Sequence, residues 1–128
     1  MKVLVVAAHG SRKKESVAEV AAFVEKLAAK ASPLFDRVVH GFLQFSDPLL
    51  PEVIETQVSC GASQIVVFPF FISAGSHILN DMPELVNAVA QAYPEVDFCL
   101  TRHLGAMASV EDLILDEMVS YLDKGTAK

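Results

Sequence analysis

The chain alternates between short apolar runs and longer segments in which apolar residues recur every three or four positions. Residues 3–8 form the first run, which is continuous and rich in β-branched side chains. That composition is typical of a strand buried on both faces of a parallel sheet. Residues 12–31 carry a helical apolar stripe with Glu and Lys outside it, and Ser32-Pro33 ends this predicted helix.

The same alternation continues along the rest of the chain. Further strands are predicted over residues 38–45, 64–71 and 96–101. A second helix is predicted to begin near Pro48 and Pro51, because proline is tolerated in the first helical turn, and to be capped by Gly61. Pro83 is predicted to open a third helix, and Val110 begins the stripe of a last amphipathic helix.

Strands and helices that alternate in this way form a parallel sheet with helices on both faces, joined by right-handed crossovers. We therefore predict an α/β fold of three layers whose four-stranded sheet has the order 2-1-3-4. That order places the two most uniformly apolar runs, residues 3–8 and 64–71, side by side at the centre. Residues 1–124 are predicted to form a single domain, with residues 125–128 as a frayed tail.

Composition and charge narrow the functional classes. A net charge of −6 and a pI of about 5.1 argue against general nucleic-acid binding, which requires clustered Lys and Arg. With 52% hydrophobic residues, the chain has an apolar surplus that predicts a deeply buried sheet or a face covered by a second copy. No apolar run is long enough to span a bilayer and no signal-peptide pattern is present, so we expect a soluble cytoplasmic protein.

The two cysteines, Cys60 and Cys99, lie far apart and form no CxxC pair. This spacing excludes a zinc ribbon or a thioredoxin-like motif. Both lie in apolar surroundings, so we predict two buried free thiols in a reducing compartment.

Ligands of open α/β sheets bind outside the carboxyl ends of the strands, where the strand order reverses. In the predicted order that point lies between the first and third strands, and each of these strands is followed by a histidine, His9 and His77. A single histidine is usually structural, but two that converge on one crevice favour metal binding, because neutral imidazole suits cobalt, nickel, iron(II) and zinc. Gly10 and Gly75 would let the backbone approach a bulky ligand.

Several other motifs are excluded. The sequence contains no P-loop, no GxGxxG after the first strand and no GxSxG elbow. The His9-Gly10 pair is similar to the start of the histidine phosphatase signature, but Ala8 occupies the position of the arginine that holds the phosphoryl group.

Two segments carry a family resemblance. Residues 5–12 read VVAAHGSR, which resembles the HGS(R) opening of the class II chelatases, and residues 68–83 read FPFFISAGSHILNDMP, which resembles their P-x-F-L-x-x-G-x-H-x-x-x-D-[IM]-P segment. The chain is most similar to the short CbiX type of sirohydrochlorin chelatase. The resemblance implies a chelatase-like fold and a homodimeric lyase that inserts a divalent metal, cobalt first and nickel or iron as alternatives, into sirohydrochlorin during cobalamin or sirohaem biosynthesis.

The resemblance also implies roles for individual residues. His9 and His77 would bind the metal and help to remove the pyrrole protons. The metal is then a substrate, and no organic cofactor, nucleic acid or membrane is expected. The residues expected to bind the tetrapyrrole are Gly10, Ser11, Arg12, Gln44, Gly75 and Ser76.

This chain departs from the family pattern at two positions. Gln44 replaces a frequent glutamate, and it can form hydrogen bonds but cannot take up a proton. Met107 stands where many members have histidine. Both changes bear on the metal used and on catalytic efficiency. Arg102 and His103 could reach the same rim, whereas His40 lies within a predicted strand and is interpreted as structural.

Two alternatives stay open. One is a metal carrier or tetrapyrrole-binding relative without turnover, and Gln44 is the feature that suggests it. The other is a structural or regulatory flavodoxin-like domain that binds neither metal nor pigment. The sequence leaves open which metal is used and whether a partner subunit completes the site.

Overall fold

Four parallel strands form the centre of the molecule, in the order β2-β1-β3-β4. The computed structural model describes residues 1–73 and 75–124, except for the side chains of residues 76, 77, 79, 123 and 124. The elements are β1 (Lys2–Ala8), α1 (Lys14–Ala31), β2 (Arg37–Phe42), α2 (Leu50–Ser59), β3 (Gln64–Pro69), α3 (Ser76–Ala92), β4 (Asp97–Leu100), the short 3-10 helix η1 (Leu104–Ala106) and α4 (Val110–Lys124). The predicted fold class and strand order are confirmed.

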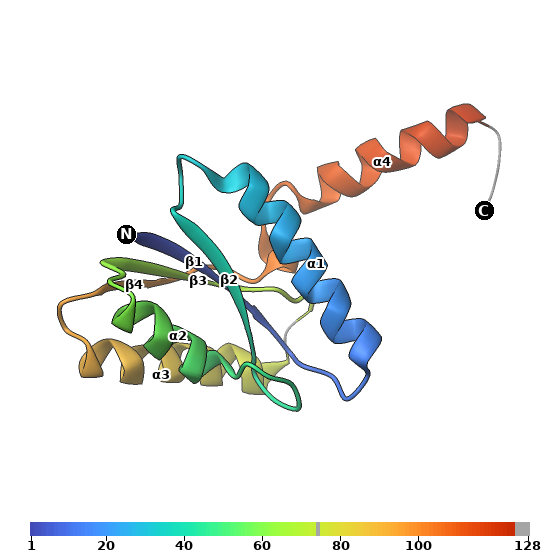
Figure 1. The fold of residues 1–128 in the computed structure, drawn as a ribbon. Coiled ribbons are helices and arrows are strands. Elements are labelled where there is room, and N and C mark those ends of the chain that lie inside the picture. The colour runs from blue at the N-terminus through green and yellow to red at the C-terminus, as the bar shows by residue number, and fades with distance from the viewer. Residues whose placement is uncertain (74, 125–128) are drawn as a thin grey trace.

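The core lies mainly between the sheet and the helices α2 and α3, which cover the same face (Figure 1). On this face the two central strands contribute side chains with no exposed area, because β1 and β3 pair directly and both are apolar. These side chains are Val3, Val5, Ile65 and Val67. Helix α1 packs on the opposite face, where its Val24 joins Val6 and Val38 in a second, smaller cluster.

The second, third and fourth strands end before the predicted positions 45, 71 and 101. The observed ends are Phe42, Pro69 and Leu100. Beyond β2 the chain still follows the end of β1, because the N–H groups of Leu43 and Gln44 donate to the carbonyl oxygens of Ala8 (2.9 Å) and His9 (3.1 Å). The apolar runs thus extend past the regular strands into the edge where ligands bind in this class of fold.

The predicted start of the third helix at Pro83 is wrong. Helix α3 begins at Ser76 and continues through Pro83, which lies inside it. Its buried face explains this: Met82 and Val86 are 4% and 5% exposed on either side of the proline, and that packing outweighs the cost of proline in a helix. The correction matters for the site, because it places His77 in the first turn of a helix and not in a loop.

The prediction of two buried thiols is also wrong, since Cys60 and Cys99 are both exposed. Cys60 follows α2 at the surface, next to Gly61, whose φ of +98° suits the predicted helix end. Cys99 lies on β4, where its neighbours Phe98 and Leu100 pack into the larger core and the alternation of side chains directs Cys99 to the other face.

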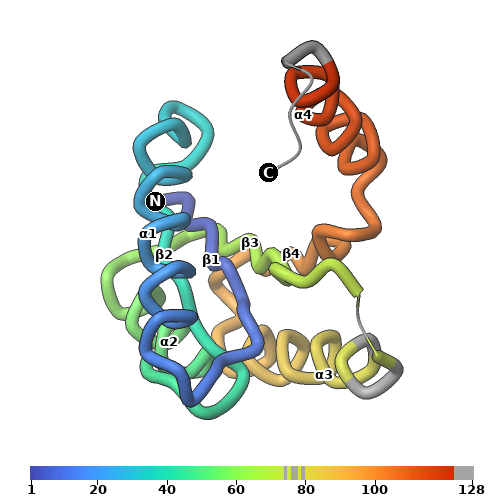
Figure 2. The backbone as a smooth tube through the Cα atoms, turned by 90° about the vertical axis from the view of Figure 1, so that its right-hand side faces the viewer, coloured from blue at the N-terminus to red at the C-terminus, as the bar shows by residue number. Residues whose placement is uncertain are grey.

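Helix α4 extends away from the rest of the molecule (Figures 1 and 2). Residues 111–122 of this helix are all exposed. The predicted tail, residues 125–128, lies outside the described residues.

Candidate functional site

His9 directly follows β1 and is exposed at the carboxyl edge of the sheet. Its carbonyl oxygen accepts the hydrogen bond from Gln44, and its ring lies 4.3 Å from the ring of Phe71, centroid to centroid, at an angle of 41°. Phe71 is only 4% exposed and so provides a fixed wall for the imidazole. The backbone and one face of His9 are therefore held in place while its side chain is open to solvent.

Gly10 turns the chain sharply after His9. Its φ is +97°, a conformation that other residues adopt only under strain. A Cβ at this position would also overlap the carbonyl oxygen of Gln44. Glycine at position 10 is thus required by the close approach of the protein's own segments, which fixes His9 and Gln44 side by side.

A cavity of about 350 Å³ opens beside His9. It is lined by residues that follow β1, residues that follow β2 and residues of the first three turns of α3: His9, Leu43, Gln44, Ile78, Asp81, Met82 and Leu85. The side chains of Ser76 and His77 lie outside the described residues, but Ile78, the next residue, lines this cavity. The structure therefore brings the segment that contains His77 to the cavity that His9 lines, as the sequence predicted for these two segments.

Asp81 is a residue of this cavity that the sequence reasoning did not single out. It follows His77 by one helical turn on α3, and residues four apart on a helix lie on the same face. The aspartate was visible in the FPFFISAGSHILNDMP segment, but the predicted helix start at Pro83 left it in a loop. A predicted helix that begins at Ser76 would have placed Asp81 on the helix that follows β3 at this edge of the sheet.

Gly75 and Ser76 lie at the start of α3, where Gly75 is the residue before the first turn and has open space around its Cβ position. The first N–H groups of a helix lack intrahelical partners and favour anions. The predicted substrate residues of this segment therefore lie where a carboxylate of a ligand can bind.

Arg12 and Ser11 connect the turn after β1 to the loop after β2. The Arg12 guanidinium lies 4.5 Å from the ring centroid of Phe45, which is 57% exposed. The Ser11 N–H donates to Ser46 Oγ (2.9 Å), whose hydroxyl donates to the Ser11 carbonyl oxygen (2.7 Å). These contacts place one cation and one exposed aromatic ring beside the start of α1, and Phe45 is a second residue that the sequence reasoning missed.

Arg102 and His103 lie beside a neighbouring cavity. They line a second cavity of about 330 Å³ together with Phe71, Ile78 and Met82. Phe71 contacts the ring of His9, and Ile78 and Met82 line both cavities. Met107, in contrast, follows η1 and is not among the residues that line either cavity.

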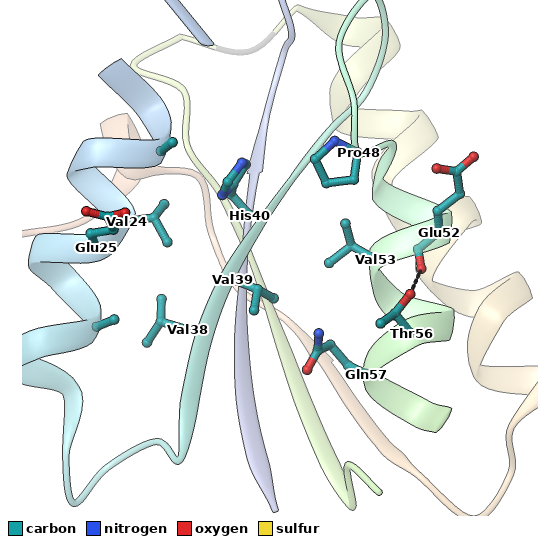
Figure 3. A pocket seen from close by; sticks show the side chains of 12 residues that line it. Val24, Glu25, Val38, Val39, His40, Pro48, Glu52, Val53, Thr56 and Gln57 are labelled. Atoms are coloured by element: carbon teal, nitrogen blue, oxygen red, sulfur yellow. Dashed lines mark hydrogen bonds between the residues drawn. The ribbon is translucent and has the colours of Figure 1, made fainter. Parts of the chain in front are cut away.

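A cavity larger than these two, about 500 Å³, lies elsewhere, at the outer edge of β2 between α1 and α2 (Figure 3). His40 points into it, and burial lowers the pKa of His40 below its ordinary value of 6.5. Glu25 and Glu52 also line it. Because this cavity is away from the carboxyl ends of the strands, we assign the candidate site to the edge near His9. Among the described side chains, no group of three or more His, Cys, Asp or Glu could hold a metal.

Comparison with known proteins shows the family of the chain. The model of the CbiX family matches residues 3–121. The chain belongs to the CbiX family. A sirohydrochlorin cobaltochelatase of Methanococcus maripaludis is 34% identical over 86 residues, which cover 67% of this chain and 58% of that relative. Other matching relatives are named sirohydrochlorin ferrochelatase.

Solved structures of related proteins have the same fold as this chain. The sirohydrochlorin chelatase SirB from Bacillus subtilis subspecies spizizenii, solved in complex with cobalt, has a TM-score of 0.78 at 27% identity, covering 93% of this chain and 50% of SirB. A CbiX protein from Marinobacter aquaeolei VT8 has a TM-score of 0.78 at 21% identity, covering 97% of this chain and 99% of that one. The chain thus spans about half to three fifths of the length of the cobaltochelatase and of SirB.

No helix in the described part of the chain has the length and apolar character needed to cross a bilayer.

Proposed function

We propose that this chain is a metal chelatase that inserts a divalent metal into sirohydrochlorin, as in cobalamin and sirohaem biosynthesis. Cobalt is the first candidate, because the first relatives are cobaltochelatases and SirB was solved with cobalt, and nickel or iron are alternatives. The observation that carries the proposal is the cavity at the carboxyl edge of the sheet, where His9 meets the first turns of α3.

In this proposal the metal and the tetrapyrrole are both substrates. His9 and His77 hold the metal through neutral imidazole nitrogens. The macrocycle must lose two pyrrole N–H protons as the metal enters, so the site also needs a proton acceptor. Asp81 is the carboxylate that lines the cavity with His9, and it supplies the anionic group that Gln44, in the position of the family's glutamate, lacks.

The polycarboxylate periphery of sirohydrochlorin requires positive partners on a chain of net charge −6. Arg12 and the N-terminal ends of α1 and α3 supply them at this edge. Ser11, Gly10, Gly75 and Ser76 then bind the substrate through their backbone, and Phe45 offers an exposed ring beside it.

The test compares His9→Ala and His77→Ala with the unchanged chain. Purified protein is mixed with sirohydrochlorin and Co²⁺, Ni²⁺ or Fe²⁺, and the rate of the visible spectral change is followed. Each substitution is expected to lower the rate about a hundredfold or more, since it removes a metal ligand or proton acceptor. His40→Asn is the matched control, because His40 lies on β2 and lines a different cavity. Full cobalt insertion by His9→Ala and His77→Ala would contradict the proposal.

The alternative is a family member that binds metal or tetrapyrrole without turnover. Gln44 favours it, because it lines the cavity beside His9 where a proton acceptor would be useful. The same assay separates the two functions, because a carrier would bind the pigment without accelerating the spectral change. Cytoplasmic location, the homodimeric state and the absence of an organic cofactor stay predictions.

A further inference from the structure

Strand β2 lies at the edge of the sheet, and most of its outer side is open. One side of β2 pairs with β1, and the other faces no further strand in the described part of the chain. The N–H group of Phe42 points to that outer side, where it donates to the carbonyl oxygen of Pro48 (2.9 Å). Backbone groups alternate in direction along a strand, so the N–H and C=O groups of Val38 and His40 point to the outer side as well. These groups lack the partner that Pro48 provides for Phe42.

The usual protections of an edge strand are few on β2. Native proteins commonly guard such an edge with lysine, proline, a bulge or a covering segment. Between Val38 and Phe42 the strand has no proline and no ionisable residue except His40. Burial lowers the pKa of His40, so its neutral form is favoured. The outer side of β2 can therefore accept another extended segment.

The cavity of about 500 Å³ follows this open side between α1 and α2, and we call it the β2 groove (Figure 3). Its walls are largely apolar, and α1 contributes small side chains that leave room beside the strand. The apolar side chains of the walls are Ala21, Val24, Ala28, Pro48 and Val53. At the start of β2, Arg37 donates a hydrogen bond to Gln57 of α2 (3.1 Å). The open strand, residues 37–41, is about 17 Å long, which suits a short extended peptide.

Each wall of the β2 groove carries one carboxylate. Glu25 lies on α1 and Glu52 on α2, on opposite sides of β2, and both residues are exposed (Figure 3). The other residues that line the groove are uncharged at pH 7. The groove therefore combines an open strand edge with one negative charge on each side, and it favours an occupant with positive charge on both sides.

We propose that the β2 groove binds an extended peptide of another protein that carries two adjacent basic residues. The peptide adds a strand beside β2 and pairs with the backbone groups of Val38 and His40. Consecutive side chains of a strand point to opposite faces of the sheet. Two neighbouring Lys or Arg side chains thus reach Glu25 on one wall and Glu52 on the other, while small apolar neighbours suit the rest of the groove.

Charge favours a basic peptide over a second copy of this chain in the groove. Two copies that paired through β2 would bring Glu25 and Glu52 of both chains together, and like charges that face each other across strands are destabilising. The net charge of −6 also favours encounters with a cationic partner. The proposal does not depend on the chelatase activity, because the groove lies away from the edge near His9.

Backbone amide hydrogen exchange, followed by NMR, tests the added strand. The probe is the capped peptide Ala-Val-Lys-Lys-Val-Ala in large excess. Exchange of the Val38 and His40 amides should slow, because their N–H groups gain partners. The amides of Val39 and Gly41 face β1 and are the internal control that should not change. Unchanged exchange at both Val38 and His40 would contradict the proposal. Slow exchange at both before the peptide is added would do so too, because another segment would already cover β2.

Peptides of matched composition test the adjacent basic pair. Ala-Lys-Val-Lys-Val-Ala has the same residues, but its two lysines point to the same face of the added strand. It should bind about twofold to fivefold more weakly than the Lys-Lys peptide, because one of the two ion pairs is lost. Ala-Val-Glu-Glu-Val-Ala should bind more weakly than both. NMR titration of the Val38 and His40 resonances gives each Kd, and equal affinities for the three peptides would overturn the proposal.

Variants of the chain test the two carboxylates. Glu25→Gln and Glu52→Gln should each weaken binding of the Lys-Lys peptide about twofold to fivefold. In the double variant the two lysine peptides should bind equally, since the walls no longer distinguish them by charge. Glu55→Gln is the matched control, because Glu55 is exposed on α2 but is not among the residues that line the groove. Full affinity of the double variant for the Lys-Lys peptide would contradict the proposal.

Discussion

At the scale of single residues, the site depends on how closely the chain packs on itself beside His9. Gly10 and Gly61 make this testable, because their φ angles are nearly equal, +97° and +98°. A Cβ at position 10 would overlap the Gln44 carbonyl oxygen, whereas at position 61 it would meet no atom within 4 Å. Gly61→Ala should cost about 1 kcal/mol from backbone strain, and Gly10→Ala clearly more.

Urea unfolding of Gly10→Ala and Gly61→Ala measures how much each substitution lowers the free energy of unfolding. Gly10→Ala is also expected to slow metal insertion, since relief of the overlap must shift His9 or Gln44. Equal losses of stability in the two variants would show that the contact with Gln44 is unimportant.

Asp81 carries a second prediction at this scale. Asp81→Asn keeps the shape of the side chain but removes its capacity to accept a proton. If it accepts pyrrole protons, kcat for cobalt insertion should fall by about a hundredfold while KM changes little, and the pH dependence of kcat should change. Asn80→Asp, one position earlier, is a control that leaves Asp81 intact. An unchanged pH profile in Asp81→Asn would assign the proton transfer to another group.

His40 predicts a pH dependence of stability. Burial lowers its pKa below 6.5, so the folded chain disfavours its protonated form. The unfolded chain therefore binds more protons as the pH falls below about 6.5, and the stabilising contribution of neutral His40 is lost in that range. Glu25 and Glu52 line the same cavity as His40, but the pKa of His40 is still lowered.

The measurement is urea unfolding of the unchanged chain and of His40→Gln at about pH 7.5 and about pH 5. The unchanged chain should lose more stability between the two values, because other groups contribute equally to both proteins. The same loss in both would show that His40 is not responsible.

At the scale of the elements, the sequence predicted the number, order and pairing of the strands, because apolar runs in a parallel sheet have few alternatives. It also predicted that the segments after the first and third strands meet. It failed at Pro83, where burial of Met82 and Val86 outweighs the tendency of proline to begin a helix and not to lie inside one. It failed at Cys99 because the alternation of side chains along β4 directs Cys99 away from the larger core that Phe98 and Leu100 join.

Pro83 and Pro51 provide a matched test of that explanation. Pro51 lies in the first turn of α2, where its missing N–H has no consequence, whereas Pro83 lies inside α3. Pro83→Ala should raise stability by about 1–2 kcal/mol, because the gain of a helical hydrogen bond exceeds the added entropy of the unfolded chain. Pro51→Ala should change it little. Thermal unfolding of both variants checks this, and destabilisation by Pro83→Ala would show that its contacts at the cavity matter more.

At the scale of the whole molecule, stability and assembly are linked. Residues 111–122 of helix α4 contribute little to the stability of a single chain, because all of them are exposed there. If the predicted homodimer buries this helix in its interface, unfolding becomes a reaction that releases two chains. Its midpoint must then rise with protein concentration.

The size of that rise follows from general unfolding parameters. A tenfold increase in concentration stabilises a dimer by about 1.4 kcal/mol, and the unfolding entropy of two chains of 128 residues converts this to roughly 2–3 °C. Calorimetry over a hundredfold range of concentration should therefore show a shift of about 5 °C in Tm. Met118→Asp should remove the shift, because the Tm of a monomer is independent of concentration. A constant Tm in the unchanged chain would mean that α4 is exposed in solution as well.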